Sequence, residues 1–215
     1  MLDISVLDNK VDISPILKNV NNGVIDEMTA ADWMQYGWEM VRSFMHFFPI
    51  YVLPTTELLD ALEELISGYK TIEIGAGSGN IGRHLGIKMT DSYLQARKDI
   101  KEYYAALGQP VIKYPQDIIK ADAITAFRRF RPECVLGCYV THKWRPGMGD
   151  DGNMYGVDFE RLLPLVKRIV IVGNKKIHSS NPIMKLPHRE IDLDGGIITR
   201  NADRSSDRIF VWDNI

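Results

Sequence analysis

The sequence predicts an α/β domain in which a mostly parallel β-sheet carries helices on both faces. Short strand-like runs at residues 70–74, 133–139 and 168–172 alternate with segments whose apolar residues recur every three or four positions. Such runs are typical of strands buried on both faces, and the segments between them provide the helical crossovers that parallel strands need. A glycine-rich turn at residues 75–79 directly follows the first run. Ligands bind at the carboxyl ends of strands in open parallel sheets, so this turn marks the expected ligand site.

Two amphipathic helices are expected before the first strand of the sheet. Apolar residues, many of them aromatic, recur at helical spacing through residues 29–48, and a second helix is expected over residues 55–66. Each segment has a Thr or Asp at its start and a Pro or Gly at its end. We therefore expect an N-terminal helical extension over residues 1–53, which covers the active-site edge as a lid, and the α/β domain over residues 54–215. The aromatic helix is equally suited to face a second subunit, so a homodimer is possible.

The rest of the chain alternates between the two kinds of segment. Strands are expected at residues 87–90, 118–119, 133–139 and 168–172, with two terminal strands near residues 196–199 and 208–212. Helices are expected at residues 80–85, 121–130 and 158–163, and a further charged helix is expected to end near residue 107.

Length and composition fit one soluble domain with peripheral additions. The chain has 215 residues, of which 45% are hydrophobic and 25% charged, and its net charge is -2. These values are unlike those of disordered or collagen-like chains. There is no strong nucleic-acid signature, although a local basic patch could be hidden in the average. No apolar run reaches about 18 residues and no signal-peptide pattern begins the chain, so we expect no membrane partner and a cytoplasmic location, or the host cytoplasm if the chain is viral.

No disulfide and no metal site are predicted. Cys134 and Cys138 would lie on one face of a strand about 13 Å apart, at about 3.3 Å per residue, which is too far for a disulfide. Neither cysteine has further His or Cys ligands at zinc-site spacing. The acidic stretch at residues 149–156 lacks the spacing of a calcium-binding loop, and we interpret it as a turn or a loop that covers substrate.

Glycines and acids cluster around the expected ligand site. Gly75, Gly77 and Gly79 permit positive φ angles and bring backbone N–H groups against a ligand at the start of a helix. Glu73 lies in the strand before them, and Asp91 ends the next strand. Asp91 is placed to accept hydrogen bonds from ribose hydroxyls.

Two cofactor classes compete for this turn. Gly77, Gly79 and Gly82 match the G-x-G-x-x-G pattern of dinucleotide-binding domains, but Gly77 comes two residues too late after the strand, and Asp91 comes too early to be the acid of that motif. The segment from Glu73 to Gly79 instead resembles the E-x-G-x-G-x-G signature of class I S-adenosylmethionine-dependent methyltransferases. We favour this second register over a nicotinamide-dependent oxidoreductase.

The resemblance covers residues 71–172, about half of the chain, and implies a Rossmann-like, doubly wound, mostly parallel sheet with an antiparallel terminal strand. It implies that Asp122 and Ala123 lie beside the adenine and that residues 131–139 form the fourth strand, which faces both cofactor and substrate. The chain is also similar to small uncharacterised methyltransferase-like proteins of bacteria and phages, which identify no substrate. The residues expected to bind S-adenosylmethionine are Glu73, Gly75, Ala76, Gly77, Gly79, Asn80, Asp91, Ser92, Asp122, Ala123 and Cys138.

Catalysis of methyl transfer depends chiefly on in-line positioning, with a base needed only for a protonated nucleophile. His142 is the best candidate base by its ordinary pKa, and Tyr139 is the second candidate. The alternatives are that His142 lies in a solvated loop and that Tyr139 packs beside the cofactor. The [DN]-P-P-[YFW] and Pro-Cys motifs of base methyltransferases are missing. We therefore expect an unidentified acceptor, a small molecule or a protein rather than a nucleic-acid base; the alternative is a catalytically inactive S-adenosylmethionine-binding or regulatory protein.

Overall fold

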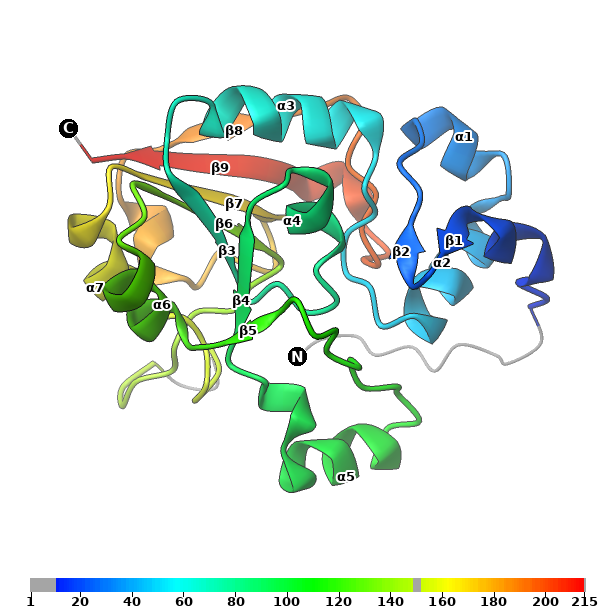
Figure 1. The fold of residues 1–215 in the computed structure, drawn as a ribbon, viewed down its shortest axis with the longest axis horizontal. Coiled ribbons are helices and arrows are strands. Elements are labelled where there is room, and N and C mark those ends of the chain that lie inside the picture. Colours follow the sequence, from blue (N-terminus) through cyan, green and yellow to red (C-terminus); the bar gives the residue numbers. More distant parts are fainter. Residues whose placement is uncertain (1–10, 149–151, 215) are drawn as a thin grey trace.

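A seven-stranded sheet forms the centre of the computed structural model, which describes residues 11–148 and 152–214 (Figure 1). The strands lie in the order β5-β4-β3-β6-β7-β9-β8. They are β3 (Thr71–Ile74), β4 (Lys88–Asp91), β5 (Ile119–Lys120), β6 (Cys134–Cys138), β7 (Arg168–Asn174), β8 (Arg189–Ile191) and β9 (Asp207–Asp213).

The pairing confirms a mostly parallel sheet with an antiparallel terminal strand. Strands β3 to β7 pair with one another in parallel, whereas β9 is antiparallel to both β7 and β8. The chain adds β4 and β5 on one side of β3 and then returns to add β6 and β7 on the other side. This reversal between β3 and β6 opens a crevice at the carboxyl ends of the strands, the usual ligand position in such sheets.

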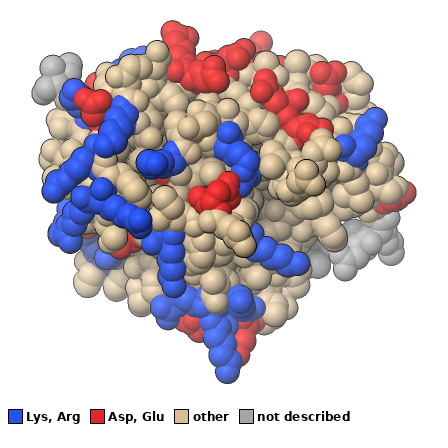
Figure 2. All heavy atoms as spheres, viewed as in Figure 1, with Lys and Arg blue, Asp and Glu red and all other residues tan. Residues whose placement is uncertain are grey.

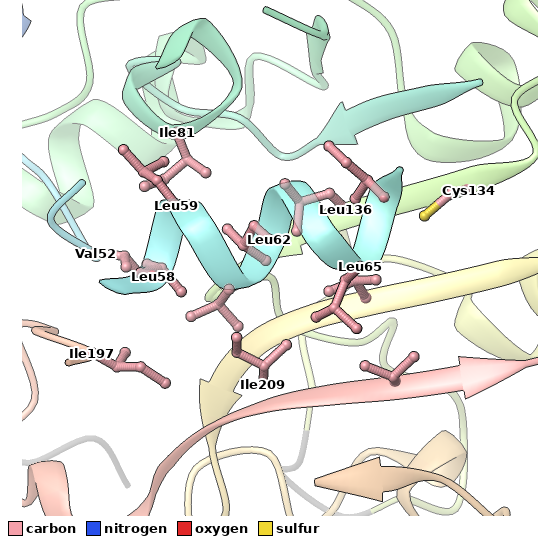
Figure 3. Close-up of a cluster of buried hydrophobic side chains, with 14 residues drawn as sticks. Val52, Leu58, Leu59, Leu62, Leu65, Ile81, Cys134, Leu136, Ile197 and Ile209 are labelled. Carbon is pink, nitrogen blue, oxygen red and sulfur yellow. The ribbon is translucent and has the colours of Figure 1, made fainter. Parts of the chain in front are cut away.

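Helices cover both faces of the sheet, as predicted. Alternate residues of each strand point to opposite faces, so Leu136 packs with α3 (Thr56–Ile66) while Val135 packs with α6 (Ala123–Phe130) and α7 (Phe159–Leu162). Figure 3 shows the apolar side of α3 against β6 and β9. Burying one such leucine contributes roughly 1.5 to 3 kcal/mol. The remaining elements of this part are α4 (Asn80–His84), α5 (Lys98–Ala106) and the 3-10 turns η2 (Leu94–Ala96), η3 (Leu163–Leu165), η4 (Pro182–Lys185) and η5 (Arg204–Ser206).

The N-terminal extension has its own apolar core. It contains η1 (Ser14–Asn19), a hairpin of β1 (Val20–Asn21) and β2 (Val24–Ile25), and two short helices, α1 (Ala30–Met34) and α2 (Trp38–Phe47). The single helix predicted for residues 29–48 is wrong, because Gly37 adopts a φ of 80° and divides it in two. Trp33 and Phe44, both fully buried, pack at 5.7 Å between ring centroids across the break. Helical spacing therefore identified the apolar residues but not the turn between the helices.

The strand predicted near residues 196–199 is also wrong. Apart from a single bridge between Thr199 and Val52, this segment does not join the sheet, whose edge is formed by β8. Ile197 is buried in the core beneath α3, whereas Ile198 is buried in the core of the extension. The run is apolar because it lies between two cores rather than within a ladder. None of the helices in the described ranges is long and apolar enough to cross a membrane.

Candidate functional site

The glycine turn begins directly after β3 and requires glycine for two separate reasons. Gly75, Gly77 and Gly79 have φ angles of 62°, 57° and 75°, in the left-handed region that disfavours other residues. A Cβ atom on Gly75 would also lie 2.9 Å from Cγ2 of Val140, and one on Gly79 would lie 2.5 Å from Cδ1 of Ile118. The turn leads into α4, with Gly79 as its N-cap.

Glu73 lies beneath the turn and is buried, with 2% of its surface exposed. Its Oε2 accepts a hydrogen bond from the Gly82 amide at 2.9 Å, and a Cβ on Gly82 would collide with this oxygen. Burial, reinforced by the nearby Asp91, raises the pKa of Glu73 to about 8, so the carboxyl holds its proton at neutral pH. Burial likewise raises the pKa of the Cys138 thiol, which is hydrogen-bonded to Glu73. The hydrogen bond between the Gly82 amide and Glu73 therefore anchors α4 to the sheet.

Asp91 fixes the other side of the turn. Its Oδ2 accepts a hydrogen bond from the Gly77 amide at 3.0 Å, and its Oδ1 accepts one from the Tyr93 amide at 2.7 Å. Burial raises the pKa of Asp91, whereas these two amides lower it. The ring of Tyr93 stacks on the ring of Tyr114, with 4.0 Å between the two centroids. Ser92, which lies between Asp91 and Tyr93 in the sequence, is exposed. Asp91 therefore positions the glycine backbone, shares a further side-chain hydrogen bond with Tyr114, and lines the cavity.

Asp122 caps α6 at the end of β5. Its Oδ1 accepts hydrogen bonds from the amides of Ile124 and Thr125, both at 3.0 Å, and its Oδ2 accepts one from the Thr125 hydroxyl at 2.7 Å. Burial raises the pKa of Asp122, but these bonds outweigh it and hold the pKa below its usual range. Asp122 and Ala123 thus stand at the mouth of the same cavity as Asp91.

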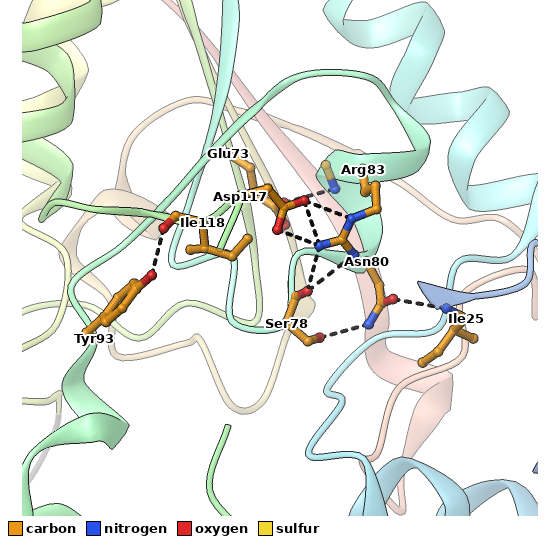
Figure 4. Close-up of polar contacts among 9 residues, drawn as sticks. Ile25, Glu73, Ser78, Asn80, Arg83, Tyr93, Asp117 and Ile118 are labelled. Carbon is orange, nitrogen blue, oxygen red and sulfur yellow. Dashed lines mark hydrogen bonds and ion pairs between the residues drawn. The ribbon is translucent and has the colours of Figure 1, made fainter. Parts of the chain in front are cut away.

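Asn80 connects the turn to the N-terminal extension, a role that the sequence did not indicate. Its Oδ1 accepts a hydrogen bond from the Ile25 amide at 3.2 Å, and its Nδ2 donates one to the Ser78 hydroxyl at 2.8 Å (Figure 4). The Ile25 carbonyl in turn lies 2.7 Å from Nε2 of His84. Arg83 extends the same group of contacts, because its guanidinium pairs with Asp117 and reaches the Ser78 carbonyl. The extension is therefore held against α4 through both backbone polar groups of one residue, Ile25.

A cavity opens at the carboxyl ends of β3, β4 and β6. Its volume of about 690 Å³ is within the range of small-molecule binding sites. Its walls include residues 49–52 of the extension and residues 153–158 of the loop after β6. Of the predicted cofactor residues, the cavity is lined by Glu73, Gly75, Ala76, Gly77, Asn80, Asp91, Ser92, Asp122, Ala123 and Cys138. Gly79 lies behind this surface, at the start of α4.

Of the two predicted catalytic residues, only Tyr139 reaches the cavity. Its hydroxyl donates to Oδ1 of Asp207 at 2.9 Å and lies 3.2 Å from the Thr199 hydroxyl. Burial and the Asp207 carboxylate raise the pKa of Tyr139, which opposes a role as a base. His142 is buried and does not line the cavity, although the flanking Lys143 does. The structure therefore separates His142 from the cofactor residues.

The loop after β6 covers one side of the cavity. Residues 149–151 of the predicted acidic loop lie outside the described residues, but residues 153–156 line the cavity. The guanidinium of Arg97, at the start of α5, lies 4.6 Å from the Tyr155 ring centroid and connects this loop to α5. Sequence reasoning missed Tyr51, Tyr104 and Arg161 as wall residues, because only the tertiary fold brings their segments here.

Comparison with protein-family models and with curated protein sequences finds no match to this chain. The function is therefore argued from the geometry of the cavity.

Proposed function

We propose that the protein is an S-adenosylmethionine-dependent methyltransferase whose acceptor is a small molecule or a protein. One observation carries the proposal: the glycine turn follows the central strand β3 at the switch point, and the acids that end β4 and β5 line the same cavity. The order of the first five strands is that of doubly wound nucleotide-binding sheets, so the sheet is compatible with a Rossmann-like fold.

The residues of the cavity fit this cofactor. Asp91 has carboxylate lone pairs for ribose hydroxyls, and Asp122 offers an acceptor for an adenine amino group beside the apolar Ala123. The backbone of Gly75 and Gly77 lines the cavity and would contact the methionine portion. When bound, S-adenosylmethionine would supply an electrophilic methyl group with a neutral leaving group. The chain would bind and orient both ligands and exclude water.

The register of the turn favours this cofactor over a nicotinamide dinucleotide. β3 ends at Ile74, so the first glycine after the strand is Gly75, as the methyltransferase signature requires. Gly82, the last glycine of the alternative pattern, lies inside α4, where its missing side chain makes room for Glu73.

A second candidate function is a binding protein that holds the cofactor without catalysis. It is favoured by the positions of the two predicted catalytic side chains: His142 is outside the cavity wall, and the Tyr139 hydroxyl is bound to Asp207. An acceptor that is already deprotonated needs no base, so these positions are also compatible with transfer by positioning alone.

Calorimetric titration with S-adenosylmethionine and with S-adenosylhomocysteine tests the cofactor. We expect both to bind, and Asp91→Ala to weaken binding more than about tenfold through loss of a charge-assisted hydrogen bond. Because Asp91 also holds the turn, Asp91→Asn is the companion variant, and a thermal melt verifies that each variant is folded. Asp117→Ala is the control, because the Asp117 carboxylate pairs with Arg83 and does not line the cavity. Unchanged affinity in both Asp91 variants would refute the ribose assignment. Absence of binding by the wild type would refute the cofactor.

Transfer is tested separately with a labelled methyl group and a broad extract. Label on a small molecule or protein supports the enzyme, whereas tight binding without transfer supports the binding protein.

A further inference from the structure

We propose that the acceptor is a small organic anion whose phosphate or carboxylate group binds Arg128, Lys143 and Arg161 on the outer wall of the cavity. This inference rests on the proposed function, since it names the substrate class of the same site. Two observations support it: the three cations line the cavity, and the carboxylates of the same cavity already have other partners.

The three cations line the cavity, and none has a side-chain partner among the described residues. Within residues 11–148 and 152–214, neither an ion pair nor a hydrogen bond involves the side-chain nitrogens of Arg128, Lys143 or Arg161. All three residues are exposed. Lone cations on a surface are common, but three that line one cavity offer a site for an anion.

The carboxylates of the same cavity are already engaged. Glu73 is protonated at neutral pH, and Asp91 and Asp122 accept bonds from backbone amides of the cofactor side. Asp158 pairs with Arg145 at 2.6 Å, and its Oδ1 also caps α7 by accepting from the Arg161 amide. Arg145 does not line the cavity, so it neutralises Asp158 from outside. The outer wall is therefore left with excess positive charge.

The cations lie where an acceptor would enter rather than where the cofactor is expected. Lys143 follows β6, and its amide donates to the Val157 carbonyl at 2.8 Å, which places it next to the start of α7 and hence near Arg161. Arg128 lies one turn from Ile124 and Thr125 on the face of α6 that lines the cavity. The glycine turn and Asp91 form the opposite side.

A small anion fits these residues better than a polyanion does. Figure 2 shows Lys and Arg gathered over the side of α6 and α5, with Asp and Glu gathered over α3. The cations outside the cavity have other contacts: the guanidiniums of Arg129 and Arg131 lie 5.0 Å and 5.4 Å from the ring centroids of Phe130 and Phe127. Within the described ranges, Arg128, Lys143 and Arg161 have no such ring contact and line a space of ligand size, where a small anion could bind all three.

The test is calorimetric titration of the full chain, saturated with S-adenosylhomocysteine, with pyrophosphate and separately with citrate. Binding of pyrophosphate alone would identify a phosphate acceptor, and binding of citrate alone a carboxylate acceptor. We expect saturable binding of at least one anion, weakened about tenfold in Lys143→Gln and in Arg161→Gln and by a smaller factor in Arg128→Gln. Arg129→Gln, one residue further along the same helix and outside the cavity, should bind as the wild type does.

The same titrations distinguish failure of this inference from failure of the proposed function. Anion binding without S-adenosylhomocysteine binding would keep the anion site and refute the cofactor. Cofactor binding without anion binding, or equal affinity in all four variants, would refute the anion site. A single-stranded oligonucleotide of about twelve nucleotides is the third probe. If it binds and Arg129→Gln weakens it as much as Arg128→Gln does, the partner is a polyanion on the outer surface and the small-anion proposal is wrong.

Discussion

Replacing Glu73 with Gln should flatten the dependence of stability on pH. Burial raises the pKa of this carboxyl from its ordinary 4.5 to about 8, so between these values the folded chain holds a proton that the unfolded chain has released. The free energy of unfolding of the wild type therefore falls as the pH rises through this window. At about 1.4 kcal/mol for each pH unit, the full loss is on the order of 5 kcal/mol, of which about 4 kcal/mol falls between pH 5 and pH 8.5.

The Gln side chain preserves the contacts but does not titrate. Its carbonyl oxygen can accept from the Gly82 amide as Oε2 of Glu73 does, and its shape leaves the packing against Cys138 unchanged. Urea unfolding at pH 5 and pH 8.5 gives the two free energies for each protein, and equal m-values show that the comparison is valid. Relative to the wild type, Glu73→Gln should gain about 4 kcal/mol on going from pH 5 to pH 8.5.

Glu133→Gln is the matched control. Glu133 lies at the surface, and its ion pair with Lys167 holds its pKa below the usual range, so it titrates below pH 5. Stability that depends on the ionised Glu133 is lost only as the pH falls through that lower range. If Glu73→Gln and the wild type show the same change between pH 5 and pH 8.5, the carboxyl is ionised in the folded protein and the reasoning is refuted.

Three further substitutions test the turn, its connection to the extension and the tyrosine beside the cavity. Gly79→Ala should cost about 1 to 3 kcal/mol more than Gly86→Ala in urea unfolding, because both residues have positive φ but only at Gly79 would the new Cβ meet neighbouring side chains; equal costs would contradict this. Asn80→Ala should lower stability by about 1 to 3 kcal/mol and speed hydrogen exchange in residues 20–30, and unchanged exchange there would show that the extension is held elsewhere. Tyr139→Phe should cost about 1 to 3 kcal/mol, because the buried Asp207 carboxylate loses a donor, while methyl transfer persists; complete loss of transfer in a folded variant would instead make Tyr139 catalytic.

The sheet could be predicted from local patterns because its strands are buried on both faces. Strands such as β6 and β7 read as continuous apolar runs, and the glycine turn fixed the end of β3 to the residue. The same logic failed for residues 196–199, which are apolar because two cores meet there. Gly37 also looked like part of a helix, since a single glycine at helical spacing does not reveal its φ angle. A run of apolar residues therefore indicates that a segment is buried, but it does not indicate which elements the segment packs against.

The candidate site was predictable where backbone chemistry decides and unpredictable where tertiary contacts decide. Gly75 and Gly77 could be identified because a sharp turn at a strand end needs positive φ. Asn80 was predicted as a ligand contact and lines the cavity, but nothing in the sequence indicated that its carboxamide also binds Ile25, 55 residues earlier in the chain. The direction of His142 depends on bridge pairing between its backbone and Val157, which no spacing in the sequence indicates.

The two sides of the cavity are suited to ligands of opposite charge. On the inner side, Asp91 and Asp122 present carboxylate oxygens whose negative charge is partly satisfied by backbone amides. This arrangement suits hydroxyl and amino donors, and it tolerates a cationic sulfonium nearby. On the outer side, Lys143 and Arg161 lack a carboxylate partner within the described ranges and would attract an anion. A cation and an anion that enter together would therefore settle on opposite walls without competing, so Arg161→Gln should change the affinity for the acceptor and leave that for the cofactor intact.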